Sequence, residues 1–170
     1  MHHQPDGVAF DIVLLLHVAC VVVGVVTTAT AAATATRLRR LLGSPLPLPE
    51  TLRRYFRPGI NWAGRTVYGI PVFGFLLLAL SHGAYALRDG WVTGGLTIFV
   101  GVVLIAEGVL WPAERRLQVS LVAVSGVDAP AAESARPAES ARRDARAMVG
   151  AATVVHALLV AGSALMLVQP

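Results

Sequence analysis

The sequence has no lysine and only one cysteine, Cys20, among its 170 residues. A single cysteine can form neither an intramolecular disulfide nor a cluster of thiolate ligands, so sites of both kinds are excluded. Charged residues are also few, at 14% of the chain, and all 14 basic residues are arginines, a usage that a GC-rich genome would explain. These arginines flank apolar stretches instead of forming a basic patch with interleaved aromatic residues. The net charge of +4 therefore does not indicate nucleic-acid binding.

Apolar residues are abundant, at 55% of the chain, and the mean hydropathy is +0.66. A soluble domain of this size could not bury so much apolar surface, whereas a lipid bilayer can cover it. The sequence thus predicts an all-α integral membrane four-helix bundle that forms a single domain, residues 1–170. The four predicted spans are at about residues 8–36, 62–87, 91–111 and 147–168.

The length and continuity of these stretches support this fold class. Each reaches the roughly 20 residues that a helix needs to cross about 30 Å of hydrocarbon. Continuous apolar runs also exclude the alternating pattern of a membrane β-barrel. The first stretch follows no basic residue and is too long for the core of a signal peptide, so we expect it to be retained.

The distribution of arginines predicts the orientation of the spans. Thirteen of the 14 arginines lie in, or at the edge of, the segments that join span one to span two and span three to span four, and only Arg88 lies on the other side. By the positive-inside rule, both termini are expected outside a bacterial plasma membrane (N-out/C-out). The tryptophans agree, because Trp91 falls at the outer interface and Trp62 and Trp111 at the inner one.

The first inner loop, residues 37–61, contains a short amphipathic pattern. Leu52, Tyr55 and Phe56 share one face of residues 49–57, and arginines occupy other positions. This pattern predicts a helix lying on the inner membrane surface. A loop anchored by its two aromatic residues is the alternative.

The second inner loop, residues 112–146, is rich in alanine, glutamate, serine and arginine. It repeats Ala-Glu-Ser-Ala-Arg at 132–136 and 138–142, which is typical of a low-complexity linker. We expect this linker to be helical toward residues 137–146, where a proline can begin a helix. On the outer side, residues 88–90 predict a tight turn in which Gly90 can adopt positive φ.

Small residues recur at steps of three and four within the spans, so they share helix faces. Gly24, Gly94, Gly101 and Gly108 are the candidate helix-packing positions. Because packing drives the association of helices in lipid, these glycines favour a tight bundle over a lined pathway.

Three histidines, His17, His82 and His156, fall within the predicted spans. An ionisable group inside a membrane is costly to keep there, so it is by default a functional hypothesis. One interpretation makes these residues candidate haem ligands, with His17 and His82 as the axial pair of a haem b in the outer half. The alternative is that neutral imidazoles form hydrogen bonds across the bundle. No other metal site is expected.

One predicted ion pair involves the charges nearest the inner ends of spans two and three. Counting from the tryptophans places Arg65 level with Glu107, whereas counting from the outer turn places it level with Glu114. A kink at Pro71, which cannot donate to the carbonyl of Val67, would explain the difference. A structural ion pair is favoured over a proton relay.

Several stretches of the sequence are distinctive. They are LHV at 16–18, FRPGINWA at 56–63, GIPVFGF at 69–75, DGW at 89–91, AEGVLWPAERRLQ at 106–118 and MLVQP at 166–170. With these stretches the chain resembles an actinobacterial family of four-helix integral membrane proteins of unassigned function. His17 and the topology also resemble a wider group that includes the copper-resistance membrane protein D and the membrane-bound protoporphyrinogen oxidase. In that group, a first-helix histidine after leucine implies haem or copper chemistry.

The sequence departs from both members of that wider group. It lacks the lysine expected of the oxidase and the histidine- and methionine-rich outer segments expected of a copper importer. An accessory or assembly partner, embedded in lipid and associated with other membrane subunits or with a second copy, is therefore favoured over an enzyme. A haem-binding redox protein is the first alternative. The second is a small transporter or channel whose route is lined by Glu107 and His156.

Overall fold

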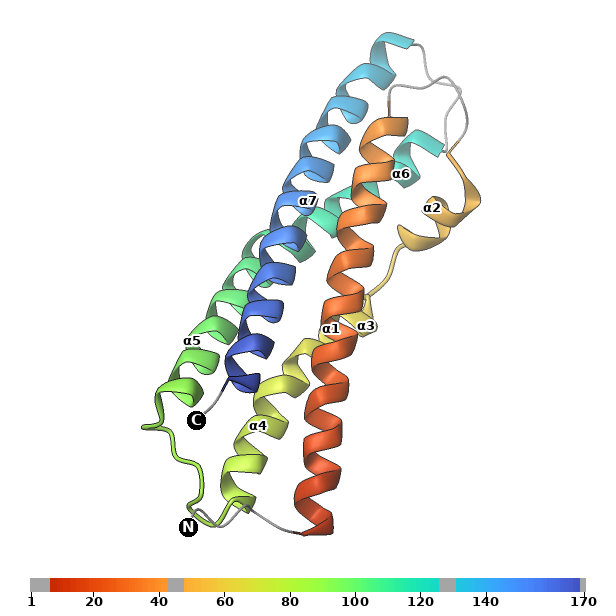
Figure 1. Cartoon of the computed structure of the whole chain (residues 1–170). Helices are drawn as coiled ribbons and strands as arrows, with labels where there is room; N and C mark the ends of the chain where they lie inside the picture. Colours follow the sequence, from red (N-terminus) through yellow and green to blue (C-terminus); the bar gives the residue numbers. More distant parts are fainter. Residues whose placement is uncertain (1–6, 43–47, 126–130, 169–170) are drawn as a thin grey trace. The chain divides into compact units, whose positions relative to one another are not determined.

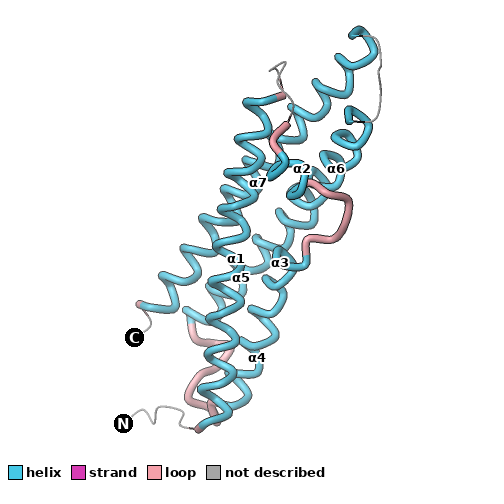
Figure 2. Tube along the Cα trace, turned by 90° about the vertical axis from the view of Figure 1, so that its right-hand side faces the viewer, coloured by secondary structure: helices cyan, strands magenta, loops and turns pink. Residues whose placement is uncertain are grey.

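A computed structural model of the chain describes residues 7–42, 48–125 and 131–168. Throughout these residues the secondary structure consists of helices joined by turns, without strands, as the sequence predicted (Figures 1 and 2). The elements are α1 (Val8–Leu41), α2 (Glu50–Tyr55), α3 (Trp62–Arg65), the 3₁₀ turn η1 (Thr66–Tyr68), α4 (Gly69–Leu80), α5 (Gly90–Ile105), the π-helical turn η2 (Ala106–Leu110), α6 (Trp111–Ser125) and α7 (Ala131–Leu167).

Four helical stretches are long and apolar enough to cross a membrane, and they follow the order of the predicted spans. They are Val8–Leu41, Trp62–Leu80, Gly90–Val122 and Ala138–Leu167. The prediction of an all-α chain with four candidate membrane-spanning helices is therefore confirmed.

Three of these helices continue beyond the expected spans. The 34 residues of α1 and the 37 residues of α7 extend about 51 Å and 56 Å at 1.5 Å per residue, against about 30 Å of hydrocarbon. Likewise α6 carries the third helical stretch to Ser125. In the 112–146 segment, helix therefore covers 112–125 and 131–146, well beyond the expected 137–146. Alanine, glutamate and arginine are strong helix formers, which accounts for this extension.

The second span ends earlier than expected, because α4 stops at Leu80 and a turn occupies residues 81–89. Positive φ occurs at His82 (49°) and Gly83 (87°), whereas Gly90 begins α5 with no such conformation. The expectation of a left-handed Gly90 was wrong. The left-handed residues instead follow the helix end directly, which is where helix C-termini commonly place them.

Two proline-linked distortions interrupt the middle of the chain. The 3₁₀ turn η1 ends three residues before Pro71, which supports the predicted irregularity at this proline. The π-helical turn η2 lies just before Pro112, and the backbone N–H of Trp111 reaches the carbonyl of Ala106, five residues earlier. A proline cannot donate the usual i→i−4 hydrogen bond. The neighbouring backbone groups therefore pair at other spacings, as they do in the 3₁₀ turn and in the π-helical turn.

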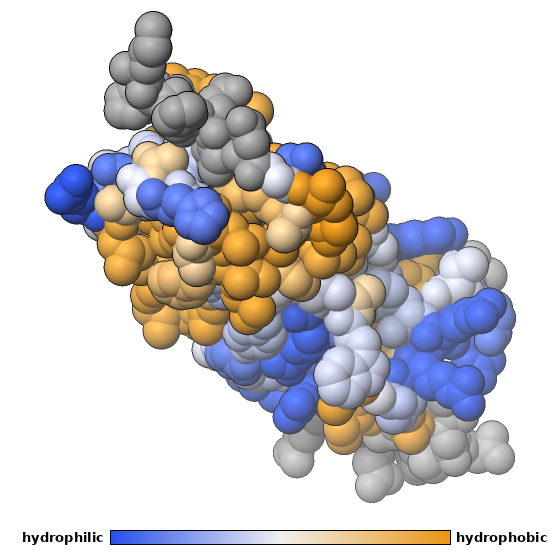
Figure 3. All heavy atoms as spheres, turned by 90° about the horizontal axis from the view of Figure 1, so that it is seen from below, coloured by the Kyte–Doolittle hydropathy of each residue, from blue (hydrophilic) through white to orange (hydrophobic). Residues whose placement is uncertain are grey.

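The chain forms two compact units. The first unit contains Met1–Thr27, Asn61–Val103 and His156–Pro170, and the second contains Thr28–Ile60 and Leu104–Val155. Among the described residues, 19 of the 25 exposed large apolar side chains belong to the first unit, whereas 17 of the 22 buried apolar residues belong to the second. Apolar side chains form much of the surface seen in Figure 3. Exposed apolar side chains are thus concentrated in the first unit, as on a lipid-facing surface, and buried apolar side chains are concentrated in the second.

Candidate functional site

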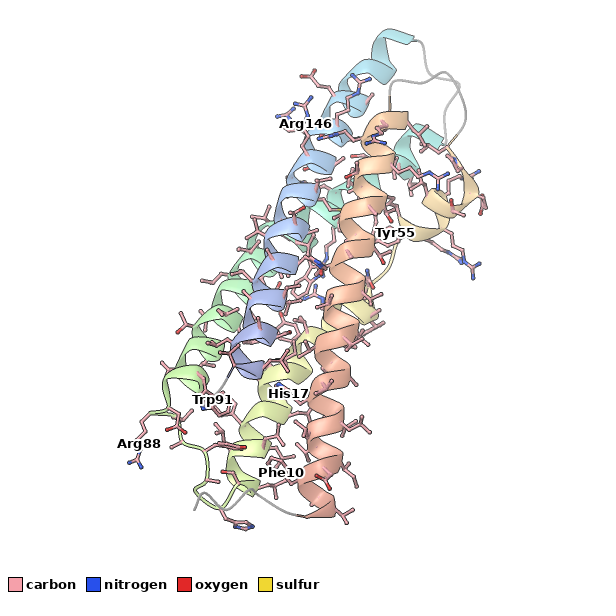
Figure 4. All side chains as sticks on the ribbon, viewed as in Figure 1. Phe10, His17, Tyr55, Arg88, Trp91 and Arg146 are labelled. Atoms are coloured by element: carbon pink, nitrogen blue, oxygen red, sulfur yellow. The ribbon has the colours of Figure 1, made fainter. Side chains whose placement is uncertain are left out.

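The first candidate site surrounds His17 on α1. This side chain is buried and lies on α1 as labelled in Figure 4. Its Nδ1 lies 2.9 Å from the backbone carbonyl oxygen of Ile70 on α4. A carbonyl oxygen can only accept, so Nδ1 carries the proton and donates it. Gly74 provides the space for the ring, because a Cβ at that position would stand 3.4 Å from Cε1 of His17. The imidazole therefore links α1 to α4 through the backbone.

The α1–α4 contact continues one turn further along α1. A Cβ added to Gly69 would lie 2.5 Å from Sγ of Cys20, so only glycine fits there without displacement. On the following turn of α1, a Cβ at Gly24 would lie 3.3 Å from Leu159 of α7 and 3.9 Å from Val67. Sequence reasoning selected Gly24 but missed Gly69 and Gly74, although the GIPVFGF stretch that contains them was distinctive.

His156 forms a second imidazole–backbone link in the same unit. Its Nδ1 lies 3.2 Å from the carbonyl oxygen of Val25, so α7 is joined to α1 as α4 is. Val25 follows His17 by eight residues, which corresponds to about 12 Å along a helix. The two histidines consequently act at different levels of α1.

The three predicted haem ligands do not converge. Two ligands of one metal ion place their nitrogens about 4 Å apart, because each metal–nitrogen bond is about 2 Å long. His17 contacts α4 between Ile70 and Gly74, whereas His82 is exposed beyond Leu80, a further six residues or about 9 Å along the helix. The geometry therefore does not bring His17 and His82 together as the axial pair of a haem b. In the described ranges there is also no group of three or more histidine, cysteine or acidic residues that could hold a metal ion.

Glycines of α5 receive long side chains of α7. A Cβ at Gly94 would lie 2.8 Å from Leu165, and one at Gly101 would lie 3.6 Å from Leu158. Gly108 differs, because a Cβ there would meet nothing within 4 Å. The structure thus places two predicted packing glycines at a helix–helix contact and leaves open space at the third.

The residues of the predicted ion pair fall in different units. Arg65 belongs to the first unit, and Glu107 and Glu114 belong to the second. Within the second unit, Glu107 lies on the exposed side of the π-helical turn, whereas Glu114 is buried in α6. The ion pair itself stays a prediction.

The second candidate site surrounds α2 in the second unit. Leu52 and Phe56 are each only 2% exposed, and the ring of Tyr55 packs edge-to-face on Phe56 at a centroid distance of 5.0 Å. The predicted helix therefore exists, but its apolar face packs against protein and not against lipid. Burial raises the pKa of Tyr55, and the negative charge of Glu114 raises it further.

Polar links hold the helices of the second unit together. Arg116 Nε donates to Asp144 Oδ1 over 2.7 Å, which joins α6 to α7. Arg142 Nη2 donates to the carbonyl oxygen of Leu42 over 3.0 Å, so α7 supplies a cation at the C-terminal end of α1. Gln118 Nε2 donates to the carbonyl oxygen of Gly59 over 3.3 Å and fixes the segment that follows α2.

The chain matches no family model, no curated protein and no solved structure in the comparisons with known proteins.

Proposed function

We propose that this protein is a multi-pass protein of the bacterial plasma membrane that acts as an accessory or assembly partner of a membrane complex, without a reaction of its own. The observation that carries the proposal is the use of His17 and His156. Both donate from Nδ1 to a backbone carbonyl of a neighbouring helix. Each of these ring nitrogens forms a hydrogen bond that joins two helices, which is a structural role.

The surface chemistry of the two units supports the membrane location. Twelve of the 14 arginines belong to the second unit, which also has most of the buried apolar core. The positive-inside rule places such an arginine-rich region in the cytoplasm and both termini outside. The second unit would then be the part that a cytoplasmic or membrane partner meets.

Labelling of single cysteines tests this orientation. In a Cys20→Ala background, Leu87→Cys in the turn before α5 and Glu139→Cys in the second unit are both exposed positions. A membrane-impermeant maleimide applied to intact spheroplasts is expected to label the cysteine at 87 and to label that at 139 only after lysis. The reverse pattern would overturn N-out/C-out.

Native gel electrophoresis tests the accessory role. Membranes solubilised in a mild detergent are expected to show the protein in a species larger than the monomer, and two differently tagged copies separate a homo-oligomer from a hetero-complex. Migration as a monomer at every detergent concentration would overturn the proposal. The resemblance to the actinobacterial family of unassigned function remains part of this proposal.

A haem protein with a single protein ligand is the second candidate. The hydrogen bond from Nδ1 of His17 to the carbonyl of Ile70 leaves Nε2 as the ring nitrogen that could ligate iron. Metal-binding histidines commonly donate their other nitrogen to a carbonyl in this way. Protein purified from cells supplied with a haem precursor would then show a Soret band that His17→Asn removes. A spectrum without this band excludes the candidate.

A further inference from the structure

Among the residues that the structure describes, α2 and the turn that follows it expose more positive than negative charge. Arg53, Arg54 and Arg57 are all exposed, and the one ion pair in this group joins Arg53 to Glu50 over 3.8 Å at the surface. Arg54 and Arg57 form no ion pair with any residue in the described ranges. Surface pairs such as that of Arg53 contribute little, so the net charge of this segment remains positive.

The packing of α2 fixes this charge in place. Leu52 and Phe56 are buried in the core of the second unit, and Gln118 Nε2 holds the carbonyl of Gly59. The helix cannot rotate to bury its arginines without exposing both apolar side chains. Arg54 lies in the last turn of α2, and the backbone N–H of Arg57, just beyond the helix end, donates to the carbonyl oxygen of Arg54 over 3.4 Å. The two residues therefore share one turn, and their like charges repel each other. An anion between them would relieve this repulsion.

An apolar side chain and the start of a spanning segment follow directly. Ile60 is exposed three residues after Arg57, and Trp62 begins the candidate span Trp62–Leu80. Between Arg57 and Trp62 the chain is five residues long, about 18 Å at full extension. Arg57 therefore lies within about 18 Å of the start of this candidate span. Anionic headgroups with attached acyl chains are concentrated at the interface where a membrane span begins.

We propose that Arg54 and Arg57 bind the phosphate of an anionic phospholipid of the cytoplasmic leaflet, with Ile60 contacting its acyl chain. Guanidinium groups suit this ligand because their planar donors match the oxygens of a phosphate. The inference rests on the membrane location proposed above, but it is independent of the accessory role.

Lipid binding to the purified full-length protein tests the site. The protein in neutral detergent is titrated with phosphatidylglycerol, with phosphatidylcholine and with soluble glycerol phosphate, and bound lipid is counted by native mass spectrometry. Phosphatidylglycerol is expected to bind in preference to phosphatidylcholine. The double variant Arg54→Gln/Arg57→Gln should weaken phosphatidylglycerol binding roughly 30-fold, since each arginine at an anionic surface contributes about a factor of five.

The matched control is Arg143→Gln/Arg146→Gln on α7. These two arginines are exposed, belong to the same unit and have the same three-residue spacing. The control is expected to bind phosphatidylglycerol within about twofold of the unaltered protein, since it removes equal charge from another surface. Equal loss in both double variants would overturn a defined site, because general attraction to the membrane would then explain the binding. If soluble glycerol phosphate competed with phosphatidylglycerol equally well, the choice of a lipid as the ligand would be overturned. Membrane fractionation of each variant tests the membrane location separately.

Discussion

Nδ1 of His17 on α1 donates a hydrogen bond to the backbone carbonyl oxygen of Ile70 on α4, over 2.9 Å. The carbonyl belongs to the residue just before Pro71, within two turns of the 3₁₀ segment Thr66–Tyr68. A helix distorted near a proline presents carbonyls that side chains of a neighbouring helix can reach. The imidazole therefore stabilises the pairing of two helices at the position where one of them is irregular.

Replacement of His17 by asparagine should lower the stability of the first unit. The shorter side chain loses the bond to Ile70 and leaves space beside Gly74. We expect a loss of about 0.5–2 kcal/mol, the range found for polar contacts between membrane helices. Thermal unfolding in detergent, followed by circular dichroism, measures this loss.

His82→Asn is the matched control for that substitution. His82 is exposed and adopts φ of 49°, a conformation that asparagine also tolerates. Its stability should stay within about 0.5 kcal/mol of the unaltered protein. Equal losses at both positions would contradict the assigned role of His17.

Gly69→Ala should destabilise the α1–α4 contact, because the new Cβ would stand 2.5 Å from Sγ of Cys20. Overpacking of this kind typically costs about 1–3 kcal/mol. Cys20→Ala removes the sulfur and leaves the Cβ of residue 20 at an ordinary 3.5 Å, so the double variant should recover most of the loss. A double-mutant cycle measures the coupling.

Gly108→Ala provides the comparison for Gly69. A Cβ at Gly108 meets nothing within 4 Å, and alanine favours helix over glycine. This variant should be neutral or more stable by up to about 1 kcal/mol. A large loss at Gly108, or no recovery in the Cys20→Ala/Gly69→Ala protein, would contradict the packing described here.

The sequence predicted the four candidate spans because composition and length alone decide which segments can cross a membrane. It did not reveal the turn at residues 81–89, since Ala84, Tyr85 and Leu87 continue the apolar character of α4 past its end. The position of His82 outside the helix follows from this turn. The hydropathy does not change at the end of α4, so it could not predict where the helix stops and the turn begins.

The core of the second unit was missed for a different reason. Its linker resembled a low-complexity repeat, yet α7 buries residues at alternating steps of four and three that form one helix face. These buried positions are Ala141, Ala145, Met148, Ala152 and Val155. The periodicity was visible in the sequence, but four of the five side chains are small or short, so the face did not stand out against an alanine-rich background.

Arg116 and Asp144 form an ion pair, and removal of one partner should lower the stability more than removal of the other. The side chain of Arg116 is 56% exposed, whereas that of Asp144 is 12% exposed. Asp144→Asn leaves a guanidinium that water can solvate and should cost less than about 1 kcal/mol. Arg116→Gln leaves a mostly buried carboxylate without its cation and should cost about 1–3 kcal/mol. Chemical denaturation of both variants measures the difference, and a greater loss in Asp144→Asn would contradict it.

The raised pKa of Tyr55 predicts that the protein loses stability at alkaline pH. Burial and the charge of Glu114 raise its pKa in the folded protein, whereas an unfolded tyrosine ionises near pH 10. Below about pH 10 both states keep the proton and the folding free energy is unaffected. Above that pH the unfolded state releases the proton while the folded state retains it, so the free energy of unfolding falls as the pH rises.

Tyr55→Phe isolates this contribution, because phenylalanine keeps the ring on Phe56 and removes the ionisable hydroxyl. The stability difference between the unaltered protein and the variant should be constant up to about pH 10, and above it the unaltered protein should lose stability more steeply. Unfolding measured at intervals from pH 8 to about pH 11 tests this, with ultraviolet absorbance reporting tyrosinate directly. Parallel stability curves over the whole range would show that the hydroxyl of Tyr55 ionises as readily in the folded protein as in the unfolded chain, which would contradict its burial against Glu114.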